Sequence, residues 1–167
     1  MPTTQTNPIV HTTKIDIPVE ARAELINILK QQMADNADLY SHSKQAHWNV
    51  KGMYFQQLHE LFDKVAEAIE PFTDELAERI VTLGGVAMGT SKMVATTTSL
   101  EDYPEDIFND QKHLEILTTH WAAYAASTRI AANRAGELGD PTTEDLFIQI
   151  SGAVDLNLYF LESHLQG

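Results

Sequence analysis

The chain has 167 residues, and its 24 acidic side chains outnumber 11 basic ones, which gives a formal net charge of -13 at pH 7. This length suits one domain with a sizeable core, and the absence of cysteine excludes disulfides, thiolate zinc sites, iron–sulfur clusters and cysteine nucleophiles. The negative charge disfavours nucleic acid and anionic membranes as partners and favours cations, which His and carboxylate side chains would have to hold.

The beginning of the chain differs from the rest. Residues 1–17 show no apolar periodicity, so we expect a flexible arm there and one domain over residues 18–167. The arm lacks the basic and apolar regions of a signal peptide, and the apolar runs elsewhere are too short to span a bilayer. We therefore expect a cytoplasmic protein without a membrane segment.

Two long helices are predicted in the first half of the domain. From Pro18 to near Asn49, apolar residues recur with the three-to-four spacing of an amphipathic helix. A second periodic segment covers residues 54–83 and stops at a Gly-Gly pair. Because its apolar phase continues across Pro71, we predict one kinked helix rather than two.

The segment that follows is long for a connection in a compact domain. Residues 88–104 are predicted either to hold a short helix around residues 91–96 or to cross the domain from end to end. Pro104 and the acids after it predict the start of a third long helix, which ends at Gly136 or Gly139.

A fourth helix is predicted from Asp140, an N-cap residue, and Pro141 at the first helical position, and it continues to the C-terminus. No segment shows sustained strand alternation. Four long helices with one long link between the second and third predict an all-α, ferritin-like four-helix bundle with one crossover connection.

Acidic and histidine side chains share one face of the second predicted helix. At about 100° per residue they fall within an arc of roughly 100°. Carboxylate oxygens with some imidazole suit Fe, Mn or Zn, while a solvated acidic face is the alternative interpretation. The side chains are His59, Asp63, Glu67, Glu70, Asp74 and Glu78.

The spacing along this face is symmetric. The pair His59 and Asp63 lies roughly 22 Å along the helix from the pair Asp74 and Glu78, so one metal cannot contact both pairs in one chain. The midpoint of residues 59 and 78 is also the midpoint of residues 63 and 74. Two antiparallel copies of the helix would therefore build two equivalent sites, each from both chains. The absence of Glu-x-x-His also argues against a di-iron site inside one bundle.

The end of the first predicted helix carries two further candidates. A turn after Asn49 can bring His47 beside His59, although a capping or core histidine is the alternative. Trp48 can pack beside the site, where an oxidisable indole could supply an electron, or it is simply a core aromatic.

Motifs over nearly the whole chain from about residue 20 form one pattern. They are QAHWNVKG at residues 45–52 with Phe55, His59-Glu60-x-x-Asp63, Asp74-x-x-Ala77-Glu78-Arg79, Leu83-Gly84-Gly85-Val86-Ala87, Tyr103-Pro104-x-Asp106-Ile107 and Phe160-Leu161-Glu162-Ser163. This combination resembles the Dps family, ferritin-like proteins of starved or oxidatively stressed bacteria.

The resemblance implies a hollow homododecamer that acts as a ferroxidase. Its centres, each with two iron ions, would take His47, His59 and Asp63 from one subunit and Asp74 and Glu78 from its two-fold mate. The implied reaction oxidises Fe(II), preferentially with hydrogen peroxide, and stores the ferric mineral in the cage, which limits hydroxyl radical formation. Zinc or another divalent metal can substitute for iron.

The resemblance also implies a pore lined by acids at the start of the last helix. Asp140, Glu144 and Asp145 are the candidates, and helix capping and the helix dipole are the ordinary explanation for acids there. His113 and His120 are expected to make ordinary hydrogen bonds.

DNA binding is not expected, although many Dps proteins coat DNA through tails rich in Lys and Arg. The arm over residues 1–17 carries one such cation, Lys14. Affinity for DNA depends on the number of phosphates that a protein neutralises, so we predict no stable complex at physiological salt. The alternative function is a DNA-compacting or structural cage with an incidental metal site.

Overall fold

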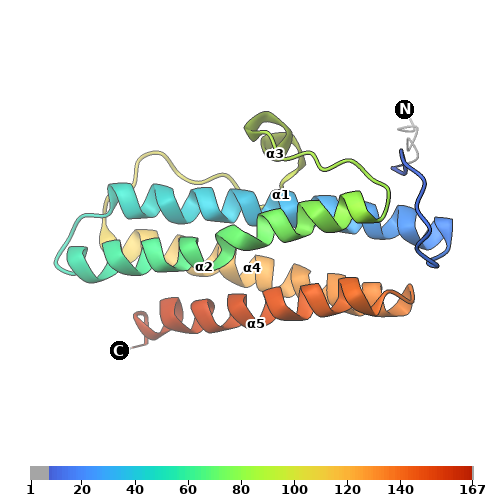
Figure 1. The fold of residues 1–167 in the computed structure, drawn as a ribbon. Coiled ribbons are helices and arrows are strands. Elements are labelled where there is room, and N and C mark those ends of the chain that lie inside the picture. The colour runs from blue at the N-terminus through green and yellow to red at the C-terminus, as the bar shows by residue number, and fades with distance from the viewer. Residues whose placement is uncertain (1–7, 167) are drawn as a thin grey trace.

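The computed structural model describes residues 8–166, which form an all-α, ferritin-like bundle (Figure 1). The short helix that was one of the two alternatives for the connection is present, and the described residues form five helices. Their bounds are α1 Val19–Asn49, α2 Phe55–Thr82, α3 Ser91–Thr97, α4 Asp110–Glu137 and α5 Pro141–Ser163.

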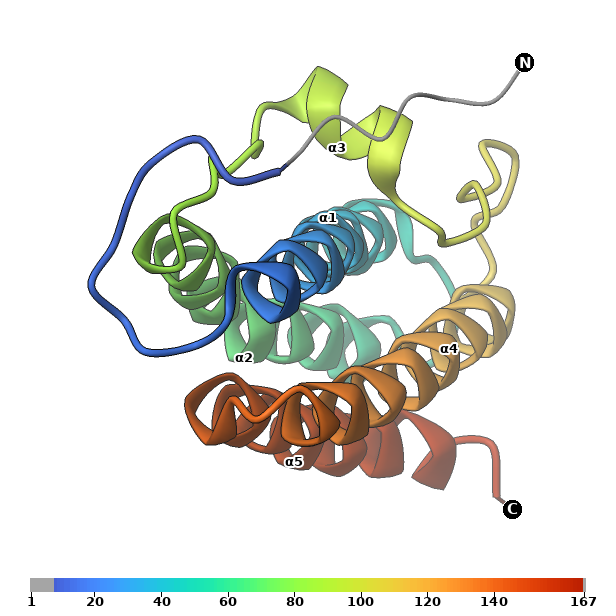
Figure 2. The ribbon, with the colours of Figure 1, turned by 90° about the vertical axis from the view of Figure 1, so that its right-hand side faces the viewer.

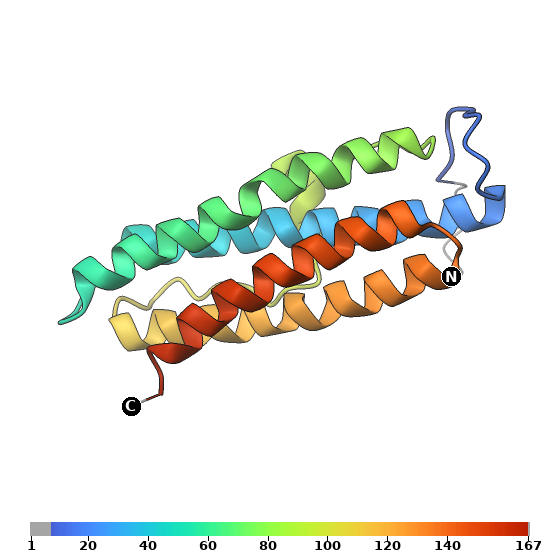
Figure 3. The same ribbon diagram turned by 60° about the horizontal axis from the view of Figure 1, so that its bottom comes forward.

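The four long helices form two antiparallel pairs, α1 with α2 and α4 with α5. The link from α2 to α4 runs back along the bundle, so that α2 and α4 point in the same direction (Figure 1). The view along the bundle shows α3 outside it, against α1 (Figure 2). On the opposite side, α5 lies beside both α2 and α4 (Figure 3). The predicted crossover topology is therefore confirmed.

Large apolar side chains from the four long helices meet in one core. Phe62 of α2, Trp121 and Tyr124 of α4, and Phe147 of α5 are fully buried. The Trp121 indole N–H donates a hydrogen bond of 3.2 Å to Ser43 Oγ of α1, which satisfies the polar end of the largest core side chain.

α2 is one helix through Pro71, as predicted. Proline removes a backbone donor and bends the helix, and a neighbouring helix supports this stretch. Asn36 Nδ2 of α1 lies 2.9 Å from the carbonyl oxygen of Ile69 and 2.8 Å from Thr73 Oγ1. The apolar face continues on both sides of Pro71 because Ile69 and Leu76 are both buried.

The predicted start of the third long helix at Pro104 is wrong, because α4 begins at Asp110. Asn109 caps the helix by accepting a hydrogen bond from the Lys112 N–H at 3.1 Å. Before the cap, the backbone pairs with the turn after α1: Lys51 N–H donates to Phe108 O at 2.7 Å, and Asp110 N–H donates to Lys51 O at 2.8 Å. This pairing holds the preceding residues out of a helix.

The turn between α1 and α2 depends on glycine. Gly52 has a φ of 143°, and a Cβ built there would lie 2.3 Å from Asp110 Oδ2. The same carboxylate oxygen accepts a hydrogen bond of 3.1 Å from the Tyr54 N–H. Asp110 thus fastens the turn to the start of α4, and the turn sets how the end of α1 faces the start of α2.

Part of the predicted N-terminal arm lies against the end of α2. The backbone N–H groups of Val10 and His11 both donate to Gly84 O, at 2.8 and 3.0 Å. Arg22 Nη1 donates to the neighbouring Leu83 O at 3.1 Å. Residues 1–7 of the arm lie outside the described residues.

Three buried histidines lie between α1, α4 and the loop that precedes α4. His42 and His120 share a hydrogen bond of 2.9 Å between their Nδ1 atoms, and His113 Nδ1 lies 2.6 Å from the Tyr103 hydroxyl. The ordinary hydrogen bonds predicted for His113 and His120 are therefore present. Burial lowers the pKa of His42, His113 and His120, so these rings are neutral in the folded protein at pH 7.

These histidines predict a loss of stability in mild acid. Because the folded pKa values are depressed, the unfolded chain takes up protons first as the pH falls below about 6.5, and the folded state loses stability there. We expect the urea midpoint to fall from about pH 7.5 to about pH 5.5, less in His120→Leu than in wild type. The exposed His164 gives the control, since His164→Gln should keep the wild-type slope. An unchanged slope in His120→Leu would contradict this assignment.

Candidate metal centre

Two histidines face each other across the turn between α1 and α2, as predicted. His47 lies in the last turn of α1 and His59 near the start of α2. Each ring places its Nδ1 against the backbone carbonyl of the other residue, at 2.7 Å for His47 and 2.8 Å for His59. The rings stack with their centroids 3.8 Å apart and their planes at 20°.

This reciprocal pairing fixes the tautomers. A carbonyl oxygen only accepts hydrogen bonds, so Nδ1 carries a proton in both rings, and in the neutral form of each ring Nε2 is the nitrogen with the lone pair. Such backbone contacts orient histidines that ligate metals. Asp63 Oδ1 lies 4.0 Å from His47 Nε2, and these residues line one shallow depression together with His59, Glu60 and Glu67.

Asp63 has a cationic partner that was not predicted from the sequence. Lys44 Nζ of α1 pairs with Asp63 Oδ1. This hydrogen bond lowers the pKa of Asp63 against the opposing effect of burial, and it raises the pKa of Lys44. A metal ion that binds Asp63 Oδ1 must therefore compete with an ammonium group. The signal in the sequence is the position of Lys44, one helical turn before His47.

Replacing Lys44 should strengthen metal binding at this site. Because a partly exposed ion pair contributes about 0.2–1 kcal/mol, Lys44→Met should lower the Zn(II) dissociation constant roughly 1.4- to 5-fold. Isothermal titration calorimetry measures this change, and the exposed Lys92 of α3 gives a matched control in Lys92→Met. Weaker binding by Lys44→Met than by wild type would show that the lysine supports the metal rather than competing with it.

Within one chain the site is incomplete. Asp74 and Glu78 are exposed farther along the same helix and do not join His47, His59 and Asp63. Among residues 8–166, no three His, Asp or Glu side chains converge closely enough to hold a metal ion. The candidate ligands thus form two groups, one where the end of α1 faces the start of α2 and one farther along α2.

Trp48 is not a core residue. Its side chain is 63% exposed at the end of α1, so the core alternative for this residue is wrong. Phe55 is also exposed, and its ring lies 5.1 Å from the ring of His59. Farther along α2, Ala77 and Val81 line a shallow hollow beside Glu78, together with Ala87 from the segment after the helix. Apolar surface thus lies beside both groups of candidate ligands.

Of the acids proposed for a pore, Asp140 has a structural role. The Asp140 side chain is 1% exposed, and both of its carboxylate oxygens accept a hydrogen bond of 2.8 Å from Arg79 Nη2. The carboxylate also caps α5 by accepting a hydrogen bond of 3.1 Å from the Thr143 N–H. The Asp140 carboxylate is therefore not free to contact ions. For this residue, helix capping is the correct explanation of the acid at the helix start. Asp145 is exposed and accepts a hydrogen bond from Gln149.

Comparisons with known proteins agree with this architecture. The ferritin-like domain family matches residues 26–167. The DNA protection during starvation protein of Agrobacterium fabrum is 42% identical over 156 residues, which cover 93% of this chain and 96% of that protein. The protein of the same name from Mycolicibacterium smegmatis is 30% identical over 86% of this chain and 78% of its own length.

Solved structures show the same likeness. DpsC from Streptomyces coelicolor superposes with a TM-score of 0.90 at 30% identity, covering 98% of this chain and 95% of that one. No helix in the described part of the chain is long and apolar enough to cross a membrane. The matched family, the extent of these similarities and the five-helix bundle agree, and the chain belongs to the Dps family of ferritin-like proteins.

Proposed function

We propose that this protein is a cytoplasmic ferroxidase and iron store. Two Fe(II) ions bind at a centre between two subunits, with His47, His59 and Asp63 from one subunit and Asp74 and Glu78 from the other. Hydrogen peroxide oxidises the iron, and the ferric product is stored inside a homododecameric cage. Zinc or another divalent metal can occupy the same ligands.

The reciprocal pairing of His47 and His59 carries this proposal. It leaves two metal-binding nitrogens beside Asp63, in a site that its own chain does not complete. The pair His59 and Asp63 and the pair Asp74 and Glu78 lie symmetrically on α2. A two-fold mate with an antiparallel α2 therefore supplies its Asp74 and Glu78 to this site and receives the same two carboxylates from this chain at its own site.

Apolar surface supports the same packing. Phe55 is exposed with its ring 5.1 Å from the His59 ring, and Trp48 is exposed at the end of α1, while the hollow of Ala77, Val81 and Ala87 lies beside Glu78. In the antiparallel arrangement, the aromatic pair of one subunit meets the hollow of its mate. Burying these side chains between subunits removes apolar area from water, which favours association.

The ligand set suits a two-electron reaction. Two Fe(II) ions give one electron each to one hydrogen peroxide, which takes up two protons and becomes two waters. Anionic carboxylate oxygens favour Fe(III) over Fe(II) because they stabilise the higher charge. Delivery of both electrons at one site avoids the one-electron cleavage of peroxide, which releases hydroxyl radical.

The stoichiometry of the wild-type protein tests this proposal. Under anaerobic conditions with limiting peroxide, we expect two Fe(II) oxidised per peroxide, measured by stopped-flow absorbance, and a spin trap that stays unreacted. One Fe(II) oxidised per peroxide, together with hydroxyl adducts of the trap, would mean that the protein does not couple two irons and would refute the proposed function.

The charge distribution predicts that DNA compaction is not a second activity. Lys14 is the one Lys or Arg among residues 1–17, and a stable DNA complex requires several cations in one place. In a gel shift with plasmid at physiological salt and with a chelator present, we expect no retention at micromolar protein. Retention that weakens as salt rises would contradict this prediction, and retention restored only by divalent cations would identify bridging between acidic protein and phosphate.

A further inference from the structure

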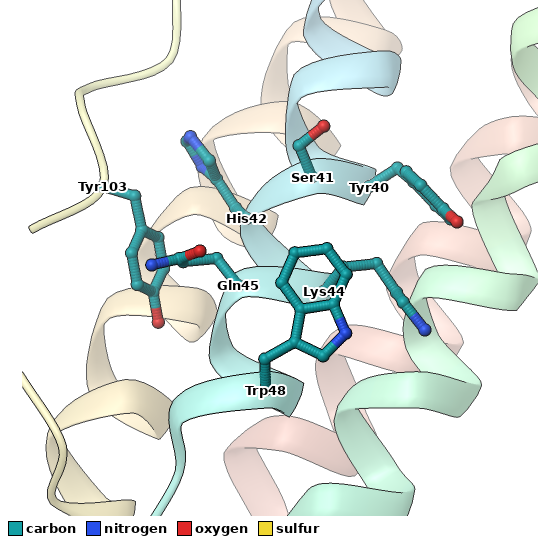
Figure 4. Close-up of a pocket in the computed structure, with 7 residues that line it drawn as sticks. All are labelled: Tyr40, Ser41, His42, Lys44, Gln45, Trp48 and Tyr103. Carbon is teal, nitrogen blue, oxygen red and sulfur yellow. The ribbon is translucent and has the colours of Figure 1, made fainter. Parts of the chain in front are cut away.

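Two buried histidines join α1 to α4 beside the segment that connects α3 to α4. The Nδ1 atoms of His42 and His120 lie 2.9 Å apart, and the two residues are 6% and 5% exposed. The connecting segment, residues 98–109, contacts both through Tyr103, whose ring centroid lies 5.3 Å from that of His42 and 6.1 Å from that of His120. Figure 4 shows Tyr103 beside His42 in a pocket that both residues line. This pocket gives protons from solvent a route to the pair.

The surroundings of the pair assign its protons. His42 Nε2 lies 3.3 Å from Asp38 Oδ1, and a carboxylate favours an N–H on the nitrogen that faces it. In the neutral His42 ring, Nδ1 then has the lone pair. The bond between the rings therefore runs from the His120 Nδ1–H to His42 Nδ1, and Nε2 of the neutral His120 ring is unprotonated.

One extra proton fits this arrangement, and a second does not. The first binds His120 Nε2 and leaves the bond between the two Nδ1 atoms unchanged. The second can bind only His42 Nδ1, because this is the last free lone pair of the two rings. Two N–H groups would then face each other at 2.9 Å, and two positive charges would repel each other in a buried contact. The doubly protonated pair must therefore separate.

The charged groups around the pair do not remove this conflict. Burial is the largest effect and lowers the pKa of both rings. Asp38 of α1 raises the pKa of both rings, and two acids of the connecting segment oppose burial in the same way, Asp102 at His42 and Glu101 at His120. A conformation that exposes the rings to water returns them to an ordinary pKa of about 6.5, so it takes up protons that the closed pair excludes.

The connecting segment depends on the same contacts. Thr98 Oγ1 donates to Asp38 Oδ2 at 2.8 Å, and the Ser99 N–H donates to Asp35 Oδ1 at 2.6 Å. Asp38 thus faces both the histidine pair and the start of the segment. Because Tyr103 lies against both histidine rings, separation of the rings displaces this tyrosine and loosens the segment around it.

We propose that His42 and His120 form a pH switch, which holds residues 98–109 against α1 and α4 at neutral pH and releases them in mild acid. The opening is local, because the buried apolar side chains between the four long helices do not titrate. The switch goes beyond the proposed ferroxidase function and does not depend on it.

Hydrogen–deuterium exchange of the assembled protein, read by mass spectrometry of its peptides, tests the switch. The N–H groups of Ser99 and Leu100 report on the segment, because both donate to side-chain oxygens. After correction for the intrinsic pH dependence of exchange, we expect their protection to fall at least about 10-fold from pH 7.5 to pH 5.5. This is the change for one proton bound at a pKa of about 6.5. Peptides from buried parts of α2 and α5 should take up no deuterium in the same period.

Two glutamine variants separate the pair from its neighbour. In His120→Gln, the amide offers both a donor and an acceptor to His42 Nδ1 and so tolerates a proton there. We expect the segment of this variant to lose most of its pH dependence. His113→Gln is the matched control, because it replaces another buried histidine of α4 that contacts Tyr103, at 2.6 Å from the hydroxyl. A phenol oxygen can accept or donate, so this contact tolerates a proton and the control should keep most of the wild-type change.

Three results would overturn the switch. Equal protection of the segment at the two pH values would show that the pair does not open. Exchange of the segment at the same rate as buried parts of α2 at pH 5.5 would show that the whole bundle unfolds instead. A pH dependence that is lost in His113→Gln and kept in His120→Gln would assign the effect to the wrong pair. Protection of α2 at pH 7.5 shows whether each variant is folded.

Discussion

Replacing His59 or Asp74 with alanine is expected to slow peroxide-driven Fe(II) oxidation by at least about 10- to 100-fold, the range that loss of an outer-shell partner alone produces at metal sites. His59→Ala removes one of the proposed imidazole ligands and also the partner of the His47 ring. Asp74→Ala removes a carboxylate that does not lie in one metal-binding group with His59 within its own chain. Stopped-flow absorbance gives both rates.

Glu70 provides the control for this result. It lies on the same acidic face of α2, between the two groups of proposed ligands, and is exposed as Asp74 is. If the face were only a solvated acidic surface, Glu70→Ala and Asp74→Ala would have similar effects. We expect Glu70→Ala to keep a rate near that of wild type. Gel filtration of all variants shows whether the assembly is intact.

Removing the Asp140 carboxylate is expected to cause the largest loss of stability. Asp140→Ala leaves the partly buried Arg79 guanidinium without its anion and α5 without its cap. Breaking a buried pair on one side costs about 3–5 kcal/mol, so we expect a fall of that size in the free energy of unfolding, measured by urea titration. Burial opposes ionisation of Asp140, but the bonds from Thr143 and Arg79 prevail and lower its pKa.

Two further variants serve as comparisons. One separates the loss of the Asp140 charge from the loss of the cap, and the other removes an exposed acid from the same helix. Asp140→Asn keeps a side-chain oxygen for the cap and should lose less stability than Asp140→Ala. Asp145→Ala removes an exposed acid of the same helix and should stay within about 0.5 kcal/mol of wild type. Equal losses in Asp140→Ala and Asp145→Ala would contradict the structural role of Asp140.

Much of this fold could be predicted because its helices carry local boundary signals. The glycines after α2 and the Asp140-Pro141 pair before α5 act within one helical turn, and the structure follows them. The start of α4 could not be predicted in the same way. Pro104 and the acids after it look locally like a helix N-terminus, but the bonds that decide the conformation come from Lys51, far away in the chain.

The candidate centre shows the same division. The approach of His47 to His59 follows from a short turn between two helices, and the sequence predicts it. The Lys44 contact to Asp63 depends on how α1 and α2 are aligned lengthwise, which periodicity does not specify. Similarly, Asp140 and Asp145 look alike in the sequence, and only the packing of Arg79 from α2 distinguishes them. The contribution of the mate stays a prediction from symmetry.

Subunit mixing tests that symmetry most directly. His59→Ala and Asp74→Ala chains, denatured together in equal amounts and reassembled, place an intact His59 opposite an intact Asp74 in about a quarter of the sites if each site is shared between two chains. We therefore predict that two nearly inactive proteins together recover about a quarter of the wild-type Fe(II) oxidation rate. A mixture no more active than its separate parents would contradict a centre built from two subunits.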